Sequence, residues 1–309
     1  MRKLLLLVPV LLLAASGVLV SAGTASAGPN PRYECHGGNI PSGTYSSVLI
    51  SGVCFLPTGS VTVTGNLRVA GGALLDAAYP GPSGLPGALA VQGNVVVGHG
   101  AVLFMGCDAA LACPTGSTIG MDTIGGSLIG DTALGVVLHS VTIYGSAGLT
   151  GGGGGVGGKI GGGKCLGNFA TGTPPPVPPL WAADPALANG IAPGVPVPVF
   201  SDFEDNLIGG DLNITGLKTC WWGSIRNYVA GSVTAIGNRA GDPDAAELVT
   251  NLIGANLTCL DNIAAPQYGD SGGSPNQVGG AAFGQCGFGI LVPNGDGGPL
   301  TPIAVPPGG

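Results

Sequence analysis

A short unit recurs along this chain, and its spacing constrains the fold more than any other feature of the sequence. Residues 65–75 reappear 28 positions later as residues 93–103, each copy holding a Gly-Asn pair, an apolar stretch and a Gly-containing turn. A related unit opens on Asn206, Asn227, Asn251 and Asn276, at spacings of 21, 24 and 25 residues. Asp122 opens another copy, with Asp in place of Asn. Repeats of this length indicate a solenoid, in which each unit packs on its neighbours.

Each unit is typical of two short strands separated by a turn. Apolar and polar residues alternate, so that one face of each strand points inward. A Gly-Gly or Gly-Ala pair then turns the chain without the steric cost of a Cβ. The pattern predicts an all-β, right-handed parallel β-helix (β-solenoid) with short coils. We expect the Asn of each unit to occupy a left-handed turn position, and stacked copies to form a hydrogen-bonded ladder.

The composition fits such a stack of small residues. The chain holds 61 glycines among 309 residues, and only 5% of its residues are aromatic. Ordinary globular chains contain about 7% glycine. No strict Gly-X-Y period is present, which excludes collagen and leaves either a disordered low-complexity chain or a regular β array. The repeat favours the β array.

Two stretches fall outside the repeat. Residues 151–163 are almost all glycine, and residues 173–198 are rich in proline. Glycine has no side chain to pack, and proline lacks the N–H that a sheet ladder needs. We therefore expect N-terminal coils over residues 28–150, a Gly/Pro-rich loop or linker over 151–200, C-terminal coils over 201–292 and a disordered tail over 293–309. Whether the two blocks of coils form one continuous helix is left open.

The first 27 residues have the three parts of a secretory signal peptide. Arg2 and Lys3 give a positive start, residues 4–20 are apolar, and Ala25-Ser26-Ala27 supplies a cleavage site before Gly28. A retained transmembrane anchor is the alternative, but the small residues before Gly28 favour cleavage. No second apolar stretch of spanning length follows. We expect a secreted or cell-wall-associated protein with no membrane contact after cleavage.

All eight cysteines lie after the predicted cleavage site. An even number of cysteines in an exported chain favours disulfides, and no Cys-x-x-Cys pair points to zinc instead. Proximity along the chain predicts the pairs Cys35–Cys54, Cys107–Cys113 and Cys259–Cys286, which leaves Cys165–Cys220. Disulfides would thus staple the coils.

The mature chain is acidic and poor in charge. Without Arg2 and Lys3 it has seven Lys and Arg against sixteen Asp and Glu, a net charge of −9. Nucleic acids and anionic membranes are bound by clustered Lys and Arg, so the balance excludes both as partners. With seven Lys and Arg in the mature chain, it also lacks the clustered basic residues that would bind an acidic polysaccharide.

Three motifs suggest catalysis or nucleotide binding and fail on inspection. Residues 269–273 match the nucleophile string of trypsin-like proteases and would make Ser271 the nucleophile, but a histidine base is also needed. The histidines His36, His99 and His139 do not lie in that family's sequence setting. Gly-His-Gly around His99 matches polygalacturonases, yet their paired-carboxylate motifs are missing. Residues 158–165 resemble a phosphate-binding loop, but Cys165 replaces the Ser or Thr that would hold magnesium.

A cluster of acidic residues offers oxygen ligands for calcium. It comprises Asp202, Glu204, Asp205, Asp211, Asp242, Asp244 and Glu247. A solvated acidic face is the alternative, so no metal, cofactor or catalytic residue is assigned. Three tryptophans, Trp181, Trp221 and Trp222, are expected to cap an exposed end of the apolar core, with a sugar-stacking platform as the alternative.

Both ends of the mature chain resemble secreted hypothetical proteins of actinobacteria. Residues 251–259 (Asn-Leu-Ile-Gly-Ala-Asn-Leu-Thr-Cys), 274–280 (Ser-Pro-Asn-Gln-Val-Gly-Gly) and 284–286 (Gly-Gln-Cys) are similar to their closing coils. Those coils carry repeats of the type Asn-x-Val-Gly-Gly-Asn-Leu and end in Gly-Gln-Cys. The segment from Cys35 through 43–45 to Cys54 resembles their first coil. The resemblance covers about half of the mature chain, and the Gly/Pro-rich middle has no counterpart. It implies a parallel β-helix and an envelope or extracellular address, and it carries no established activity.

Two classes of function fit these observations. The first is a non-catalytic cell-surface or extracellular protein, a rigid stapled rod that binds cell-wall or host glycans or associates with itself. The second is a carbohydrate-active enzyme, a polysaccharide lyase or glycosidase, on the same scaffold. A convergent set of carboxylates and basic residues on one face would distinguish the enzyme. The sequence predicts the first class, because no such set is apparent.

Overall fold

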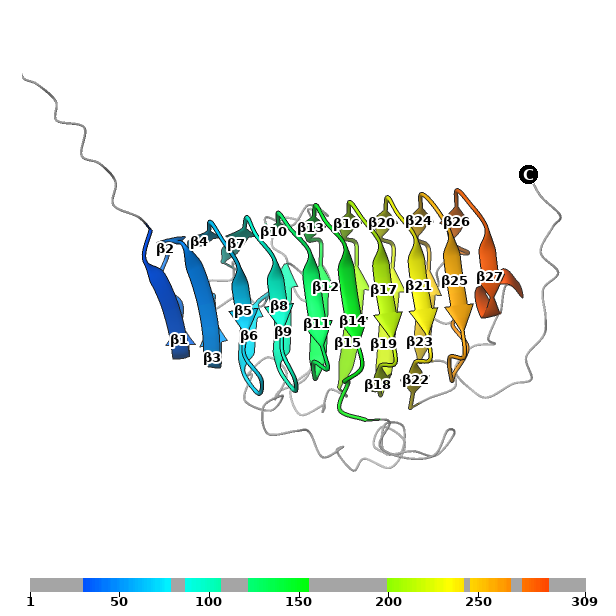
Figure 1. Ribbon diagram of the computed structural model, residues 1–309, viewed down its shortest axis with the longest axis horizontal. Helices are drawn as coiled ribbons and strands as arrows, with labels where there is room; N and C mark the ends of the chain where they lie inside the picture. Colours follow the sequence, from blue (N-terminus) through cyan, green and yellow to red (C-terminus); the bar gives the residue numbers. More distant parts are fainter. Residues whose placement is uncertain are drawn as a thin grey trace, which may run out of the picture.

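The computed structural model describes residues 30–78, 87–106, 122–155, 199–241, 245–267 and 274–288. The predicted signal peptide and the predicted tail lie outside these residues. So do Ser271 and residues 158–165. The described chain forms 27 strands, all paired in parallel, and stacks them into the predicted β-solenoid (Figure 1). Among the described residues, no helix has the length and apolar character needed to cross a bilayer.

The coils contribute their strands to three faces. The first face is a nine-stranded sheet of β2 (Gly43–Tyr45), β4 (Ser60–Val63), β7 (Ala88–Val91), β10 (Thr123–Ile124), β13 (Thr142–Ile143), β16 (Leu207–Ile208), β20 (Tyr228–Val229), β24 (Leu252–Ile253) and β26 (Gln277–Val278). The second face comprises β5 (Leu67–Val69), β8 (Val95–Val97), β11 (Leu128–Asp131), β14 (Ala147–Thr150), β17 (Leu212–Thr215), β21 (Val233–Ile236), β25 (Leu257–Leu260) and β27 (Ala282–Gly284).

The third face holds the residues of the candidate site. It comprises β6 (Leu74–Ala77), β9 (Val102–Gly106), β12 (Gly135–His139), β15 (Phe200–Glu204), β19 (Trp221–Ile225) and β23 (Ala246–Val249). At the start of the stack, β1 (Arg32–Asn39) pairs with β3 (Ser47–Phe55), which in turn pairs with both β5 and β6. The second and third faces are therefore one hydrogen-bonded sheet. Two short strands, β18 (Lys218–Thr219) and β22 (Arg239–Ala240), pair separately, and a 3-10 helix (Gln285–Phe288) follows β27.

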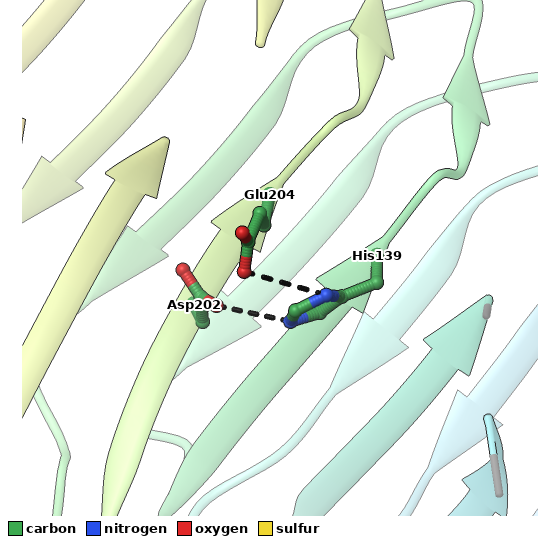
Figure 2. A group of neighbouring side chains, drawn as sticks. All are labelled: His139, Asp202 and Glu204. Carbon is green, nitrogen blue, oxygen red and sulfur yellow. Dashed lines mark ion pairs between the residues drawn. The ribbon is translucent and has the colours of Figure 1, made fainter. Parts of the chain in front are cut away.

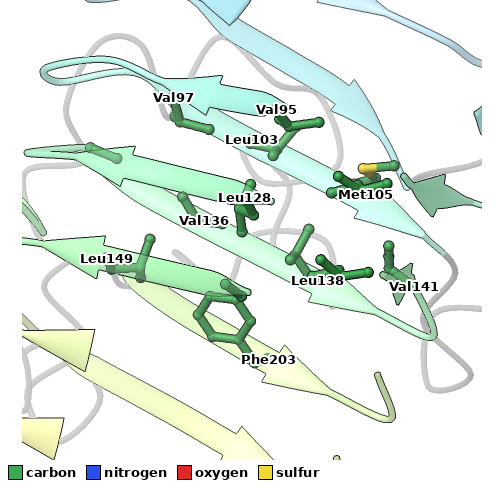
Figure 3. Close-up of a cluster of buried hydrophobic side chains, with 14 of the residues drawn as sticks. Val95, Val97, Leu103, Met105, Leu128, Val136, Leu138, Val141, Leu149 and Phe203 are labelled. Carbon is green, nitrogen blue, oxygen red and sulfur yellow. The ribbon is translucent and has the colours of Figure 1, made fainter. Parts of the chain in front are cut away.

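Aliphatic side chains that alternate along the strands fill the interior. In β8, Val95 and Val97 are buried while Val96 between them is partly exposed. Val95 stacks between Leu67 of the coil before and Leu128 of the coil after. Figure 3 shows such residues gathered inside the stack. Each buried Val or Leu side chain contributes roughly 1.5–3 kcal/mol, so a core with few aromatic residues is still stabilised.

The coils before and after the Gly/Pro-rich region form one continuous stack. Strands β12, β13 and β14 pair directly with β15, β16 and β17, so that Ala147 lies beside Leu212, 65 residues further along. Strand β14 ends at Thr150 and β15 begins at Phe200. The question that the sequence left open is thus answered: residues on either side of 156–198 share one core.

The predicted asparagine ladder is present at one corner of the stack. The backbone N–H of Asn206 donates to Asn227 Oδ1 at 3.0 Å, and the side-chain amide of Asn227 donates to Asn251 Oδ1 at 3.0 Å. Asn276 continues the row by accepting from the Asn251 side chain at 2.7 Å. The first three are buried. Their amides satisfy backbone groups that each turn would otherwise leave unpaired.

The predicted left-handed conformation of these asparagines is wrong. Positive φ angles occur instead at the residue before each of the first three, at Asp205 (56°), Arg226 (54°) and Thr250 (57°). The asparagine side chain has to point inward to reach the next coil, so the preceding residue makes the turn.

Two further ladders were not predicted. One is a row of buried amides at a second corner, Asn238, Asn262 and Gln285. In the other, each side chain accepts a backbone N–H from the next coil, along Asn66, Asn94, Ser127, Ser146, Asp211, Ser232 and Asn256. The second row mixes Asn, Ser and Asp, because any short side chain with an acceptor oxygen can make this bond.

Disulfides join neighbouring coils at both ends of the described stack. Cys35 of β1 is bonded to Cys54 of β3, and Cys259 of β25 is bonded to Cys286 of the 3-10 helix. Both pairs are the ones predicted from proximity. Cys220 is also disulfide-bonded; the other three cysteines, Cys107, Cys113 and Cys165, lie outside the described residues.

Candidate functional site

The third face is buried on both of its sides, unlike the other two. All five residues of β9 and of β12 are buried, whereas strands of the second face alternate between buried and exposed residues. Outward-facing Val102, Phe104 and Val137 form a second apolar cluster, separate from the interior core. Ionisable groups on the outer side of this face are therefore held away from water, where charge is costly.

Three ionisable side chains meet on this outer side, His139, Asp202 and Glu204 (Figure 2). The parallel register of β12 and β15 places His139 directly beside Glu204. Asp202 precedes Glu204 by two residues, so both carboxylates leave the strand on the same face. Asp202 Oδ2 lies 3.0 Å from His139 Nε2, and Glu204 Oε2 lies 3.5 Å from His139 Nδ1. The imidazole thus sits between two carboxylates.

Arg226 closes the cluster on its more exposed side. Asp205 and Arg226 occupy the left-handed turn positions of consecutive coils, and the guanidinium holds both Asp205 oxygens at 2.8 Å. The same guanidinium also contacts Glu204. Hydrogen bonding to Asp205 raises the pKa of Arg226 above its usual value, so it stays charged. Arg226 therefore forms ion pairs with both Glu204 and Asp205, and neither of these contacts involves Asp202.

Burial makes Glu204 titrate near neutral pH. Desolvation raises its pKa to about 7, with a further upward contribution from Asp202, while His139 and Arg226 oppose the change. Asp202 is 4% exposed and His139 is 8% exposed. Among the described residues, no donor lies within hydrogen-bonding distance of Asp202 Oδ1, although this atom is buried. The cluster is thus left with an excess of buried acceptor oxygen.

Trp221 and Gly223 complete the surroundings on the next strand. Gly223 lies beside Asp202 in the register, and a Cβ at position 223 would lie 2.6 Å from Asp202 Oδ1 and collide with the Trp221 ring. The Trp221 indole N–H donates to Glu247 Oε1 at 2.9 Å, and its ring packs edge-on against Phe200 with centroids 5.9 Å apart. Glycine is therefore required here for the carboxylate and the indole to pack together.

The cluster is suited to binding a proton or a small cation, not a polymer. An imidazole and two carboxylates offer one ligand atom each, and these atoms lie within 4.8 Å of one another. The same groups could exchange protons with a substrate, but His139 and Asp202 are too deeply buried for a polysaccharide to touch them.

The predicted acidic cluster separates into several places. Asp202, Glu204 and Asp205 do lie together. Asp211 lies elsewhere, accepting the Ser232 N–H at 2.7 Å in the Asn/Ser ladder. Glu247 lies on β23, one strand beyond Gly223, and Asp242 and Asp244 fall outside the described residues.

The other two histidines lie apart from this cluster. His99 lies in the turn between β8 and β9, with Nδ1 3.2 Å from the Thr132 hydroxyl. His36 is exposed beside Ser51.

The tryptophan prediction is wrong for Trp222. This side chain is fully buried in the interior of β19, between β15 and β23, and does not cap an end of the core. Trp221 is partly buried and bonded to Glu247. Trp181 lies outside the described residues.

Sequence reasoning did not connect His139 with the acidic residues. The signal was present in the repeat, since residues 138–143 (Leu-His-Ser-Val-Thr-Ile) align with residues 203–208 (Phe-Glu-Asp-Asn-Leu-Ile). That alignment places His139 opposite Glu204. Val141 stands where the other repeat units have the ladder asparagine, so this unit is hard to recognise as a copy of the repeat.

Comparisons with known proteins give no match: no family model, no curated protein and no solved structure is similar to this chain. The resemblance to secreted actinobacterial proteins stays a prediction.

Proposed function

We propose that the protein is a non-catalytic extracellular binding protein that holds a neutral polysaccharide of a cell wall or host surface. The observation that carries the proposal is an exposed apolar strip on the first face, made of Tyr144, Leu207, Tyr228 and Leu252. These side chains are 66%, 47%, 45% and 47% exposed. Large apolar groups gathered on a surface are typical of binding sites.

The strip is regular because the solenoid imposes its spacing. Leu207, Tyr228 and Leu252 are neighbours in the register of β16, β20 and β24. Strands in a sheet lie about 4.8 Å apart, so the three side chains form a straight row. Tyr144 follows β13, the strand next to β16. A straight, flat row suits an extended, repetitive ligand.

The chemistry of the strip favours a neutral glycan. A tyrosine ring offers an apolar face for the C–H groups of a sugar and a hydroxyl for its polar groups. The chain carries nine Lys and Arg against sixteen Asp and Glu, which disfavours an acidic polysaccharide. Self-association through the same strip is the competing use, and the oligomeric state distinguishes it.

Binding without turnover is favoured by the position of the ionisable cluster. His139, Asp202 and Glu204 lie on the third face, and the strip lies on the first. A ligand on the strip therefore does not contact the only group of His, Asp and Glu that converges in this way among the described residues. The alternative, a carbohydrate-active enzyme, would need the buried cluster to be opened.

The disulfide bonds support an extracellular location. Disulfides persist outside the reducing cytosol, and two of them lie at the ends of the described stack. The predicted signal peptide and the resemblance to secreted actinobacterial proteins agree with this address.

The test is a pull-down of the mature protein on insoluble neutral polysaccharides and purified cell walls, with analysis of the released sugars. We expect retention on at least one neutral polymer and no oligosaccharide release over hours. Release of oligosaccharides would establish the enzyme instead. A concentration-dependent dimer with no glycan retention would establish self-association.

A further inference from the structure

We propose that His139, Asp202 and Glu204 form a binding site for one Zn²⁺ ion on the third face. The proposal does not depend on the glycan-binding function, since the two sites lie on different faces of the solenoid. It adds a metal and a histidine ligand that neither the acidic composition nor the repeat indicated.

The three side chains bring the ligand atoms of a zinc site close together. Zinc binds His nitrogen and carboxylate oxygen at about 2.0–2.2 Å, so two ligands in a tetrahedral arrangement are roughly 3.4 Å apart. Asp202 Oδ2 lies 3.0 Å from His139 Nε2, and Glu204 Oε2 lies 3.5 Å from the other ring nitrogen, Nδ1. One ring nitrogen would bind the metal, and the carboxylate that faces the other nitrogen would have to rotate toward it; one ligand atom from each of the three residues already lies within 4.8 Å of the others. Three protein ligands leave one position for water.

The scaffold holds the ligands before any ion binds. All three come from adjacent strands in a fixed register, and none lies on a loop. Gly223 leaves the space in which the Asp202 carboxylate sits beside the Trp221 ring. Sites built on paired strands lose little entropy on binding, because the backbone is already ordered.

The buried carboxylate of Asp202 is the second observation that points to a cation, since its Oδ2 faces His139 while its Oδ1, on the Gly223 side, has no partner in the described part of the chain. Asp202 Oδ1 is buried and accepts no hydrogen bond from the described residues. A buried carboxylate oxygen without a partner is costly, and Arg226 is already engaged by Glu204 and Asp205. A divalent ion would balance the charges of Asp202 and Glu204.

The imidazole selects the kind of metal. Calcium prefers six to eight oxygen ligands, whereas an imidazole with two carboxylates suits zinc and its first-row neighbours. Glu204 is the more exposed carboxylate of the pair, with 20% of its side chain accessible against 5% for Asp202.

The experiment is isothermal titration of the chelator-treated full secreted chain with Zn²⁺, and with Ca²⁺ in a parallel arm. We expect one Zn²⁺ per chain and a rise in melting temperature that saturates at one equivalent, with Ca²⁺ binding at least about 100-fold more weakly. His139→Gln and Asp202→Asn should each weaken Zn²⁺ binding by at least about tenfold, since even outer groups of metal sites contribute that much.

Matched controls use the same residue types elsewhere. His99→Gln and Asp211→Asn change a histidine and an acidic residue outside the cluster and should leave the affinity unchanged. Circular dichroism checks that each variant folds. If a cluster variant does not fold, Co²⁺ substitution in the wild-type protein supplies the second measurement, because a four-coordinate site with an imidazole ligand gives visible absorption bands.

Several outcomes would overturn the proposal. These are no Zn²⁺ binding at micromolar concentrations, preference for Ca²⁺, affinity that is unchanged in His139→Gln and Asp202→Asn, or a Co²⁺ spectrum without four-coordinate bands. The first would mean that the imidazole and carboxylates simply form ion pairs.

Discussion

Replacing Asn227 with alanine tests whether the asparagine ladder stabilises the stack. This side chain is 1% exposed and lies in the middle of the row. Its amide nitrogen donates to the Phe203 carbonyl at 2.7 Å, and its Oδ1 accepts the Asn206 backbone N–H at 3.0 Å. Alanine removes both contacts at a position that bulk solvent does not reach.

The expected cost follows from the groups left without partners. A buried donor or acceptor that loses its partner costs about 1–3 kcal/mol, and two backbone groups are affected, so we expect a loss of about 4 kcal/mol. A change of 1 kcal/mol shifts the melting temperature of a domain of this size by about 2–4 °C, so Asn227→Ala should melt roughly 10 °C lower. The lost bond to Asn251 Oδ1 adds to this.

The assay is thermal and urea denaturation, with Asn256→Ala as the matched control. Asn256 belongs to another ladder and is exposed, with one side-chain bond to the Ala281 N–H at 3.0 Å. Water can replace that bond, so its removal should cost less than about 1 kcal/mol. Equal losses for the two variants would refute the reasoning, because burial would then make no difference.

Three further predictions concern titration, covalent links and packing. Burial raises the pKa of Asp122 to about 7 against the opposing hydrogen bonds from Leu89 and Gly106. The folded state therefore binds a proton that the unfolded state has lost, and unfolding free energy should fall by up to about 4 kcal/mol between pH 4 and pH 7. Denaturation at several pH values checks this, and Asp122→Asn should make the slope shallower without abolishing it, since Glu204 also titrates near pH 7; an unchanged slope in the variant would contradict it. Reduction of the end disulfides should expose the end coils to limited proteolysis before the middle ones, and an identical cleavage pattern with and without reductant would argue against their role. Gly223→Ala should cost about 2 kcal/mol through the clash with Trp221 and Asp202, whereas Gly148→Ala, with its nearest atom 3.8 Å away, should be close to neutral in the same melts.

Much of the fold was predictable because the solenoid is local and repetitive. The spacing of 28 residues between the first two units corresponds to the pairing of Leu67 with Val95. The opening asparagines could be placed on one ladder because buried amides at equivalent positions stack. The sequence did not reveal which residue makes the left-handed turn. Asp205 and Arg226 do so, but polar residues of these types are also common on any solvent-exposed face.

The candidate site could be predicted only in part. Asp202 and Glu204 stood out as acidic residues in an alternating strand, but His139 is 65 residues from Glu204 in sequence. The long insertion between β14 and β15 breaks the period at that point. A local pattern cannot reveal that two strands on either side of an insertion are neighbours, and here only the alignment of complete coils does so.

The most direct test of the proposed function compares two sets of variants for polysaccharide binding. Tyr144→Ala with Tyr228→Ala removes the rings of the apolar strip, and Phe283→Ala removes a ring of similar exposure from the second face. Truncating an aromatic residue at the centre of a binding surface commonly costs more than 1 kcal/mol. We predict that the double variant binds its polysaccharide at least about tenfold more weakly, while Phe283→Ala binds as wild type does. Equal affinity of the double variant and the wild type would contradict the account.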